Sequence, residues 1–213
     1  MDDIVSKKTM EILKRVGAII TDSHFVLTSG RHSDSYVNKD FIYAFPAEVS
    51  EICRLMAERF KDKPIDVVVG PAMGGVLLAQ WTAYHLSKLK GHVVHGVFTD
   101  KDSENNQVFK REYDKFVNGK NVLVVEDIAT TGGSVRKSVD SVKNAGGNVL
   151  AVSIIVNRRP DHVTNEVVGA SLFPLVSMQT KDFEEKECIW CKEGRPINTT
   201  VGHGKDFLAH KKA

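Results

Sequence analysis

The chain of 213 residues is poor in cysteine, carries no excess of either charge and lacks any long apolar run. Its three cysteines, Cys53, Cys188 and Cys191, are too few for a disulfide framework. The 29 basic and 27 acidic residues leave a formal net charge of +2, without the basic excess typical of nucleic-acid-binding domains. No stretch reaches the ~18 apolar residues of a membrane span, and the start Met-Asp-Asp-Ile-Val lacks the features of a signal peptide. We expect a cytoplasmic protein without nucleic-acid or membrane partners.

Ligands for a protein-bound metal also look too few. The segment Cys188-Ile189-Trp190-Cys191 carries two thiols at a spacing that can bind one zinc ion, but a closed zinc site needs four ligands. The distant His203 adds at most one more. We therefore expect free or packed thiols and predict no metal site.

The spacing of apolar residues predicts an α/β protein. Helical patterns cover residues 3–18 and 48–60, with a mixture of β-forming and turn residues between them. From Ile65 onward, runs of β-branched residues alternate with helical stretches, as in a parallel sheet covered on both faces. We expect strands over 65–69, 92–98, 121–125, 149–156 and 171–176, and helices over 75–89 and 134–145. This gives a sheet of about five mainly parallel strands, in a core domain spanning 46–180. An N-terminal helix and small lobe would occupy 1–45, and a C-terminal extension 181–213.

One segment, residues 122–134, joins a buried strand, two acids, a small-residue turn and a helix start: Val-Leu-Val-Val-Glu-Asp-Ile-Ala-Thr-Thr-Gly-Gly-Ser. N–H groups at a helix N-terminus attract phosphate, and glycines let the anion approach the backbone. Glu126 and Asp127 stand at the carboxyl end of the strand, where carboxylates can accept hydrogen bonds from sugar hydroxyls. The whole pattern predicts a ribose 5-phosphate site, although a glycine pair alone would indicate only a turn with Ser134 as helix cap.

A second glycine turn, Gly70-Pro71-Ala72-Met73-Gly74-Gly75, follows the first strand of the sheet and opens a helix. It can also present main-chain donors to an anion, although such a turn is by itself as compatible with simple helix entry.

The segment 122–134 resembles, at every position, the phosphoribosyl pyrophosphate signature of the type I phosphoribosyltransferases. The resemblance implies the type I fold with a small hood lobe, and transfer of ribose 5-phosphate from 5-phosphoribosyl 1-pyrophosphate (PRPP) to a nitrogenous base. It implies that Glu126 and Asp127 hold the ribose hydroxyls, that the signature turn binds the 5-phosphate and that the first turn binds pyrophosphate. Mg²⁺ carried by PRPP would be the cofactor, and the enzyme would be a homodimer. The two turns would supply Ala129, Thr130, Thr131, Gly132, Gly133 and Ser134, and Pro71, Ala72, Met73 and Gly74.

Residues 25–38 resemble the start of the orotate phosphoribosyltransferases, and the likeness extends over about residues 15–160. It implies orotate as the base, with orotidine 5′-monophosphate as the product in pyrimidine biosynthesis. Tyr36 and Val37 would line the base and Thr130 would lie near it. Arg158 would hold the carboxylate, which a guanidinium can grip with two hydrogen bonds, although Arg159 could serve instead.

The connection over residues 99–120 is long, polar and charged, which predicts a lid without a confident helix of its own. The family resemblance makes its cations Lys101, Lys110 and Arg111 catalytic together with Asp127, reaching the site of the partner subunit.

Three features depart from the family pattern. This lid has no histidine, whereas the orotate enzymes usually carry a basic, histidine-containing string there, and Met73 and Thr28 stand where many members have lysine. Two alternatives stay open: a phosphoribosyltransferase for a purine or another pyrimidine, and a non-catalytic PRPP-binding regulator.

Overall fold

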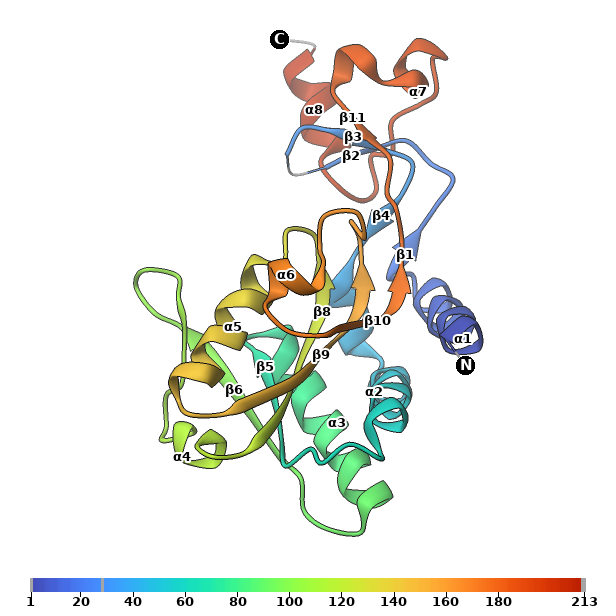
Figure 1. The fold of residues 1–213 in the computed structure, drawn as a ribbon. Helices are drawn as coiled ribbons and strands as arrows, with labels where there is room; N and C mark the ends of the chain where they lie inside the picture. The colour runs from blue at the N-terminus through green and yellow to red at the C-terminus, as the bar shows by residue number, and fades with distance from the viewer. Residues whose placement is uncertain (1, 28, 212–213) are drawn as a thin grey trace.

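The computed structural model describes residues 2–27 and 29–211, which form a sheet-centred core and a smaller lobe beyond one end of it (Figure 1). In chain order the elements are α1 (Asp2–Arg15), β1 (Ile19–Ile20), β2 (Phe25–Val26), β3 (His32–Ser33), β4 (Tyr36–Val37), η1 (Lys39–Ala44), α2 (Pro46–Phe60), β5 (Val67–Pro71), α3 (Gly74–Lys90), β6 (His95–Lys101), β7 (Gln107–Val108), α4 (Asp114–Val117), β8 (Asn121–Ala129), α5 (Gly133–Asn144), β9 (Asn148–Asn157), α6 (Asn165–Val168), β10 (Leu172–Ser177), β11 (Asp182–Phe183), η2 (Glu185–Glu187), α7 (Ile189–Lys192) and α8 (Gly204–Lys211).

The central sheet has six strands in the order β10-β9-β8-β5-β6-β7. Five strands are parallel, and the short β7 pairs antiparallel with β6 at one edge. The prediction of about five mainly parallel strands flanked by helices is therefore confirmed. Both predicted anion turns leave neighbouring strands, β5 and β8, at their carboxyl ends, so the topology brings the two turns to the same edge of the sheet.

Helices cover both faces of the sheet, because successive strand residues point to opposite sides. In β5, Val68 packs with the apolar residues of α2 and α3, whereas Val67 and Val69 face the opposite cluster, which contains the buried face of α5. Strand β8 alternates in the same way. Strands buried on both faces account for the unbroken apolar runs in the sequence.

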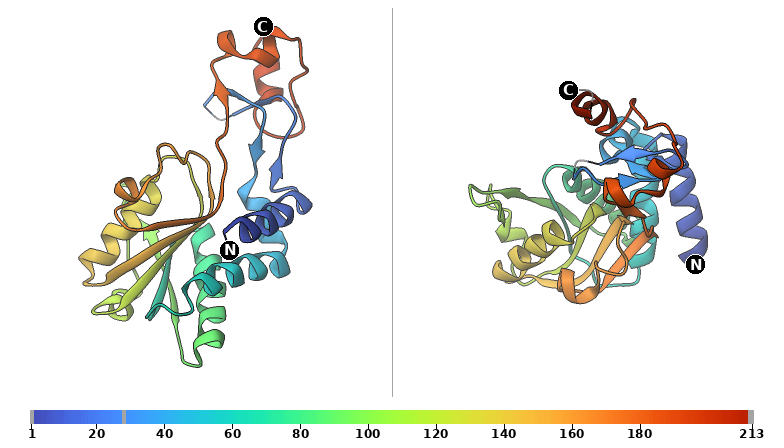
Figure 2. Two further views of the ribbon diagram at one scale, coloured as in Figure 1. Left: turned by 45° about the vertical axis from the view of Figure 1, so that its right-hand side comes forward. Right: turned by 90° about the horizontal axis from the view of Figure 1, so that it is seen from above.

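The smaller lobe, which we call the hood, is built from two distant parts of the chain, residues 21–35 and 179–211 (Figures 1 and 2). Its three-stranded antiparallel sheet has the order β11-β3-β2, so a C-terminal strand pairs with the N-terminal hairpin. The antiparallel pair of β1 and β4 connects this lobe to the core.

The predicted division at residues 45 and 180 stays a prediction, but the structure adds two facts that it did not anticipate. Helix α1 packs on the core, with its Ile12 and Leu13, and Val16 directly after it, inside the apolar cluster of α2 and α3. The segment beyond residue 180 is part of the hood, because β11 pairs with β3. Within residues 2–27 and 29–211, no helix is both long and apolar enough to cross a membrane.

Candidate active site

The two signature acids lie at the end of β8 and are almost fully buried, with 6% of Glu126 and 2% of Asp127 exposed. The hydroxyl of Tyr43 donates a hydrogen bond to Asp127 Oδ2 at 2.9 Å, and Ser134 Oγ donates to Glu126 Oε2 at 3.2 Å. Burial, and then the Asp127 carboxylate, raise the pKa of Tyr43, so this hydroxyl stays protonated as a donor. Tyr43 lies in η1, outside any motif recognisable in the sequence, so its contact with Asp127 could not be predicted.

The signature turn forms an open loop at the N-terminus of α5. Gly132 adopts a left-handed conformation with φ of 76°, and a Cβ there would lie 2.9 Å from a methyl group of Val167. Thr130, Thr131 and Ser134 are exposed; Gly132, the residue before α5, has no side chain to cap the helix, and Thr131 Oγ1 accepts the Gly133 N–H at 3.5 Å. The turn therefore exposes the hydroxyls of Thr130 and Thr131 at the N-terminus of a helix, where a phosphate is favoured.

The first glycine turn lies directly beside the acid pair. A Cβ on Gly74 would overlap both Asp127 Oδ2 and the Tyr43 hydroxyl, so only glycine fits there without movement. Gly70 and Gly75 pack against each other in the same way, which closes the turn tightly. Pro71 is buried and Met73 is 85% exposed, and the peptide between Ala72 and Met73 is cis. The structure thus brings the two predicted anion turns and the acid pair together.

A cavity of about 310 Å³ lies between the hood and the core. Its lining joins the four predicted base-site residues with the neighbouring arginine and with hood residues: Leu27, Ser29, Tyr36, Val37, Thr130, Arg158, Arg159, Thr180 and Asp182. Thr130 belongs both to this cavity and to the signature turn, so the cavity opens beside the place expected for the ribose.

Arg158 follows β9, and its backbone N–H donates to the Ala129 carbonyl at 2.9 Å. Its Nε is buried and has no hydrogen-bond partner among the described residues. Burial lowers the pKa of this guanidinium, partly offset by the charge of Asp182. A buried donor without a partner costs free energy, so this side chain is poised for an acceptor that the protein itself does not supply. Arg159 is exposed.

The predicted lid is more regular than expected. It extends β6 to Lys101, turns at Asp102 and returns as β7, and the short helix α4 follows. The sequence showed no confident helix here, and the structure adds the four-residue helix α4. The Asp102 carboxylate accepts N–H bonds from Glu104 and Asn106, which fixes the turn.

The three predicted lid cations do not converge on the acid pair of their own subunit. Lys110 Nζ donates to the Lys101 carbonyl at 3.2 Å, and Arg111 pairs with Asp100 and lies over the Phe98 ring. Lys101 ends β6, and Lys110 and Arg111 follow the edge strand β7, so β5 lies between all three and β8. Thr28, one of the departures from the family pattern, lies outside the described residues.

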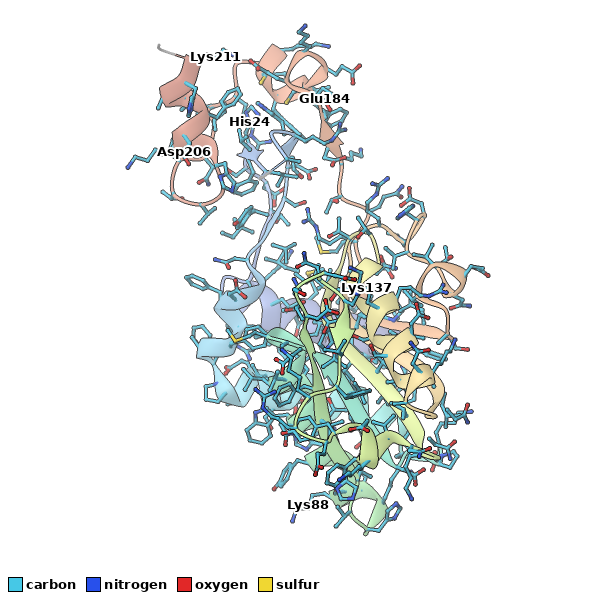
Figure 3. All side chains as sticks on the ribbon, turned by 90° about the vertical axis from the view of Figure 1, so that its left-hand side faces the viewer. His24, Lys88, Lys137, Glu184, Asp206 and Lys211 are labelled. Atoms are coloured by element: carbon cyan, nitrogen blue, oxygen red, sulfur yellow. The ribbon has the colours of Figure 1, made fainter. Side chains whose placement is uncertain are left out.

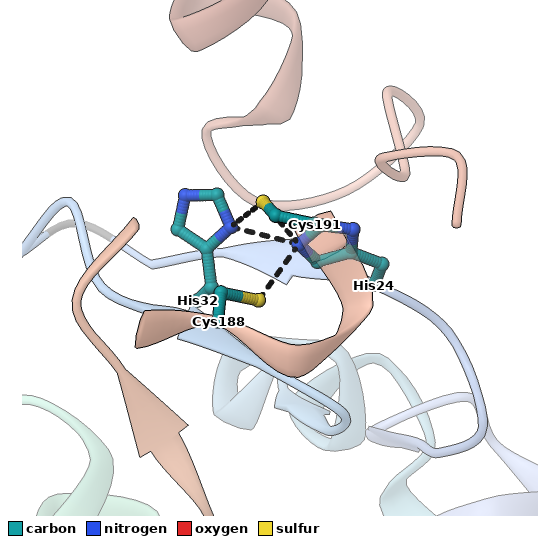
Figure 4. A group of neighbouring side chains, drawn as sticks. All are labelled: His24, His32, Cys188 and Cys191. Carbon is teal, nitrogen blue, oxygen red and sulfur yellow. Dashed lines mark hydrogen bonds between the residues drawn. The ribbon is translucent and has the colours of Figure 1, made fainter. Parts of the chain in front are cut away.

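The structure places Cys188 and Cys191 in a group that the sequence analysis did not foresee. Their sulfur atoms converge with ring nitrogens of His24 and His32, and the four ligand atoms lie within 4.8 Å of one another (Figure 4). The premise that only a distant His203 could join the thiols is wrong, because pairing of β11 with β3 carries the cysteine segment onto the N-terminal hairpin. The signal available in the sequence was the two histidines, His24 and His32, in the stretch of β-forming and turn residues between the first two predicted helices.

Comparisons with known proteins agree with this geometry. A family model described as a phosphoribosyl transferase domain matches residues 38–168, which defines the class of protein. A curated orotate phosphoribosyltransferase of Caldanaerobacter subterraneus subsp. tengcongensis is 37% identical over 191 residues, covering 90% of this chain and 94% of the relative. The chain belongs to the orotate phosphoribosyltransferase family.

Solved structures show the same fold. A crystal structure of Mycobacterium tuberculosis orotate phosphoribosyltransferase with Fe(III) dicitrate matches with a TM-score of 0.64 and 24% identity, over 81% of this chain and 96% of that one. A second structure of that enzyme, in complex with 5-phospho-alpha-D-ribosyl 1-diphosphate, matches with a TM-score of 0.55 and 21% identity, over 79% and 88%. The predicted type I fold, the resemblance to the orotate enzymes and a pentosyl-transferring enzyme are confirmed.

Proposed function

We propose that this protein transfers ribose 5-phosphate from PRPP to orotate, giving orotidine 5′-monophosphate and pyrophosphate in pyrimidine biosynthesis. The observation that carries the proposal is the cavity in which Arg158, with its partnerless buried Nε, lies opposite the hood and next to Thr130 of the signature turn. A purine offers no carboxylate for that guanidinium, whereas orotate does. The name of the curated relative supports the same choice of base.

In this reaction the bond from ribose C1 to the pyrophosphate oxygen breaks, a ring nitrogen of orotate forms a bond to the same carbon, and the proton of that ring N–H is released to the leaving pyrophosphate or to solvent. Negative charge develops on the leaving pyrophosphate, and positive charge on the ribose. Glu126 and Asp127 would accept hydrogen bonds from the ribose hydroxyls, with Tyr43 holding the Asp127 carboxylate in place. The turn of α5 would bind the 5-phosphate, and the turn before α3 the pyrophosphate.

Arg158 would fix the base by its carboxylate, while Tyr36 and Val37 line the hood side of the same cavity. These contacts would orient the base nitrogen towards C1 when orotate binds, so the entropy cost of orienting the two reactants is met before the reaction step.

PRPP would enter as its Mg²⁺ complex. The two buried carboxylates, Glu126 and Asp127, are oxygen donors of the kind that suits this cation, so the site fits the complex. The cation would neutralise charge on the leaving pyrophosphate. The expected cytoplasmic location stays a prediction.

A homodimer would complete the site. Lys101, Lys110 and Arg111 lie at the sheet edge away from their own acid pair, which supports the proposal that they serve a partner subunit. Their charges would then add to the stabilisation of the leaving pyrophosphate.

The direct test follows orotate consumption and pyrophosphate release in the presence of PRPP and Mg²⁺. The wild-type protein is expected to turn over, and the double variant Glu126→Gln with Asp127→Asn serves as the matched control for contaminating activity. If the variant and the wild type give equal rates, the activity does not come from this site.

A further inference from the structure

The hood contains a compact group of four metal-ligating side chains that the proposed reaction does not use. His24 and His32 come from the β2–β3 hairpin, and Cys188 and Cys191 flank the first turn of α7 (Figure 4). Both histidines and Cys188 are at most 1% exposed. Figure 3 shows His24 inside the hood, well separated from Lys137 on α5 and Lys88 on α3. None of the four residues lines the base cavity, and the acid pair lies in β8 of the core sheet, so the group is distinct from both.

Three distances between a sulfur and a ring nitrogen of the group are close to those around a tetrahedral zinc ion. With Zn–N bonds of about 2.0–2.1 Å and Zn–S bonds of about 2.3 Å, neighbouring nitrogen and sulfur ligands stand ~3.5 Å apart. The Cys188 Sγ–His24 Nε2 distance is 3.6 Å, and Cys191 Sγ lies 3.8 Å from His24 Nε2 and 3.4 Å from His32 Nδ1.

The two imidazole nitrogens are closer than this geometry requires. They lie 2.7 Å apart, so they would separate by roughly 0.6 Å around zinc. The rings are tilted by 49° to each other, and a small rotation of either ring opens that distance.

The outer contacts of His24 orient it as a ligand. Its Nδ1 lies 2.9 Å from the Arg195 carbonyl, which can only accept, so Nδ1 of the neutral ring carries the proton. Nε2 then presents its lone pair to the group. A hydrogen bond from the second ring nitrogen to a backbone carbonyl is the usual support of a metal-bound histidine.

The group also joins the two halves of the hood. His24 and Cys188 are 164 residues apart in the chain, yet their side chains are in contact where the two halves of the hood meet. Among the described residues, the buried Phe25, Val26 and Trp190 of the hood belong to neither apolar cluster of the core. A small lobe with so little apolar interior commonly depends on a metal or disulfides for stability.

We propose that His24, His32, Cys188 and Cys191 bind one Zn²⁺ ion in a closed structural site that holds the two halves of the hood together. Two sulfur and two imidazole donors favour zinc in tetrahedral geometry, and four protein ligands leave no position for a substrate. Binding displaces the thiol protons to solvent, since thiolate is the ligating form. By holding the β2–β3 hairpin against β11, the ion would also fix Leu27 and Asp182 on the hood side of the base cavity.

The test begins with the metal content of the full-length protein, produced without a histidine tag and measured by mass spectrometry of the elements. We expect about one zinc per chain, and X-ray absorption at the zinc edge should give sulfur at ~2.3 Å and nitrogen at ~2.0–2.1 Å in equal numbers. Protein with no zinc above the buffer blank that also takes up none when zinc is added would overturn the proposal. Stoichiometric iron in place of zinc would overturn it as well.

Matched variants locate the ion. Cys191→Ser and His32→Ala are expected to lose zinc, whereas Cys53→Ala and His203→Ala, which change the same residue types outside the group, should keep it. Equal loss from all four variants would refute the assignment.

Because a ligand variant can fail to fold, wild-type protein stripped with a chelator provides a second readout. Limited proteolysis is expected to cut it first within residues 179–211, and added zinc should restore protection. Identical cleavage of stripped and zinc-loaded protein would refute the structural role. Neither measurement involves a substrate, so the outcome is independent of the proposed activity.

Discussion

Replacing Arg158 by glutamine tests how this protein selects its base. The side chain lines the base cavity, and its Nε is buried without a partner in the described structure. A bound carboxylate would therefore accept hydrogen bonds from the guanidinium without displacing a protein acceptor from Nε. Hydrogen bonds to charged groups contribute about 1.5–3 kcal/mol, which corresponds to a roughly 10- to 150-fold fall in kcat/KM for orotate. The KM for PRPP should change by less than about twofold, because the ribose and phosphate contacts are made elsewhere.

Two further variants make this prediction specific. Arg158→Lys keeps the positive charge but loses the planar guanidinium. We therefore expect its kcat/KM for orotate to lie between those of the wild type and the glutamine variant. Arg159→Gln changes the exposed neighbour and should lower kcat/KM by no more than about threefold. Steady-state kinetics with varied orotate at saturating PRPP measure all three. An unchanged kcat/KM in the Arg158→Gln variant, or an equal loss in Arg159→Gln, would show that the carboxylate is held by another group.

Three other predictions concern the PRPP site and the assembly. Glu126→Gln combined with Asp127→Asn should weaken PRPP binding, measured by calorimetry, by more than about tenfold, because two charged acceptors are lost. The circular dichroism spectrum should stay unchanged. An affinity equal to that of the wild type would show that the two acids do not bind the ribose. Gly74→Ala should also weaken PRPP binding, since its Cβ would displace the Asp127 carboxylate, and normal affinity would mean that the turn adapts freely. Mixing a Lys110→Ala, Arg111→Ala variant with an Asp127→Asn variant should restore activity on subunit exchange, whereas a mixture that stays inactive despite proven exchange would place the lid over its own subunit's site.

The strand-turn-helix unit around the acid pair could be predicted from sequence because all its signals are local. The β-branched run, the acids and the glycines follow one another within residues 122–134, and β8 and α5 form over them. The turn before α3 could be located in the same way. Its close approach to Asp127 could not, because that contact depends on the pairing of β5 with β8.

The N-terminal part of the hood could be predicted from the resemblance to the family, but its C-terminal half could not, because the contacts between the two halves are non-local. Two-residue strands such as β3 and β11 carry no periodic signal, and they pair across most of the chain length. The Cys188–Cys191 spacing was visible in the sequence, but its two histidine partners lie more than 150 residues away. The β6–β7 hairpin was easier to predict from sequence, because Asp102 and Asn105 are typical turn residues.

The central claim is that orotate is the base this protein uses, and a competition assay tests it most directly. The protein is incubated with PRPP, Mg²⁺ and equal concentrations of orotate, uracil, adenine and hypoxanthine, and the nucleotides formed are identified by mass spectrometry. The account predicts orotidine 5′-monophosphate as the dominant early product, with the preference over uracil reduced in the Arg158→Gln variant. A purine nucleotide or uridine 5′-monophosphate as the main product, or no nucleotide at all, would contradict it.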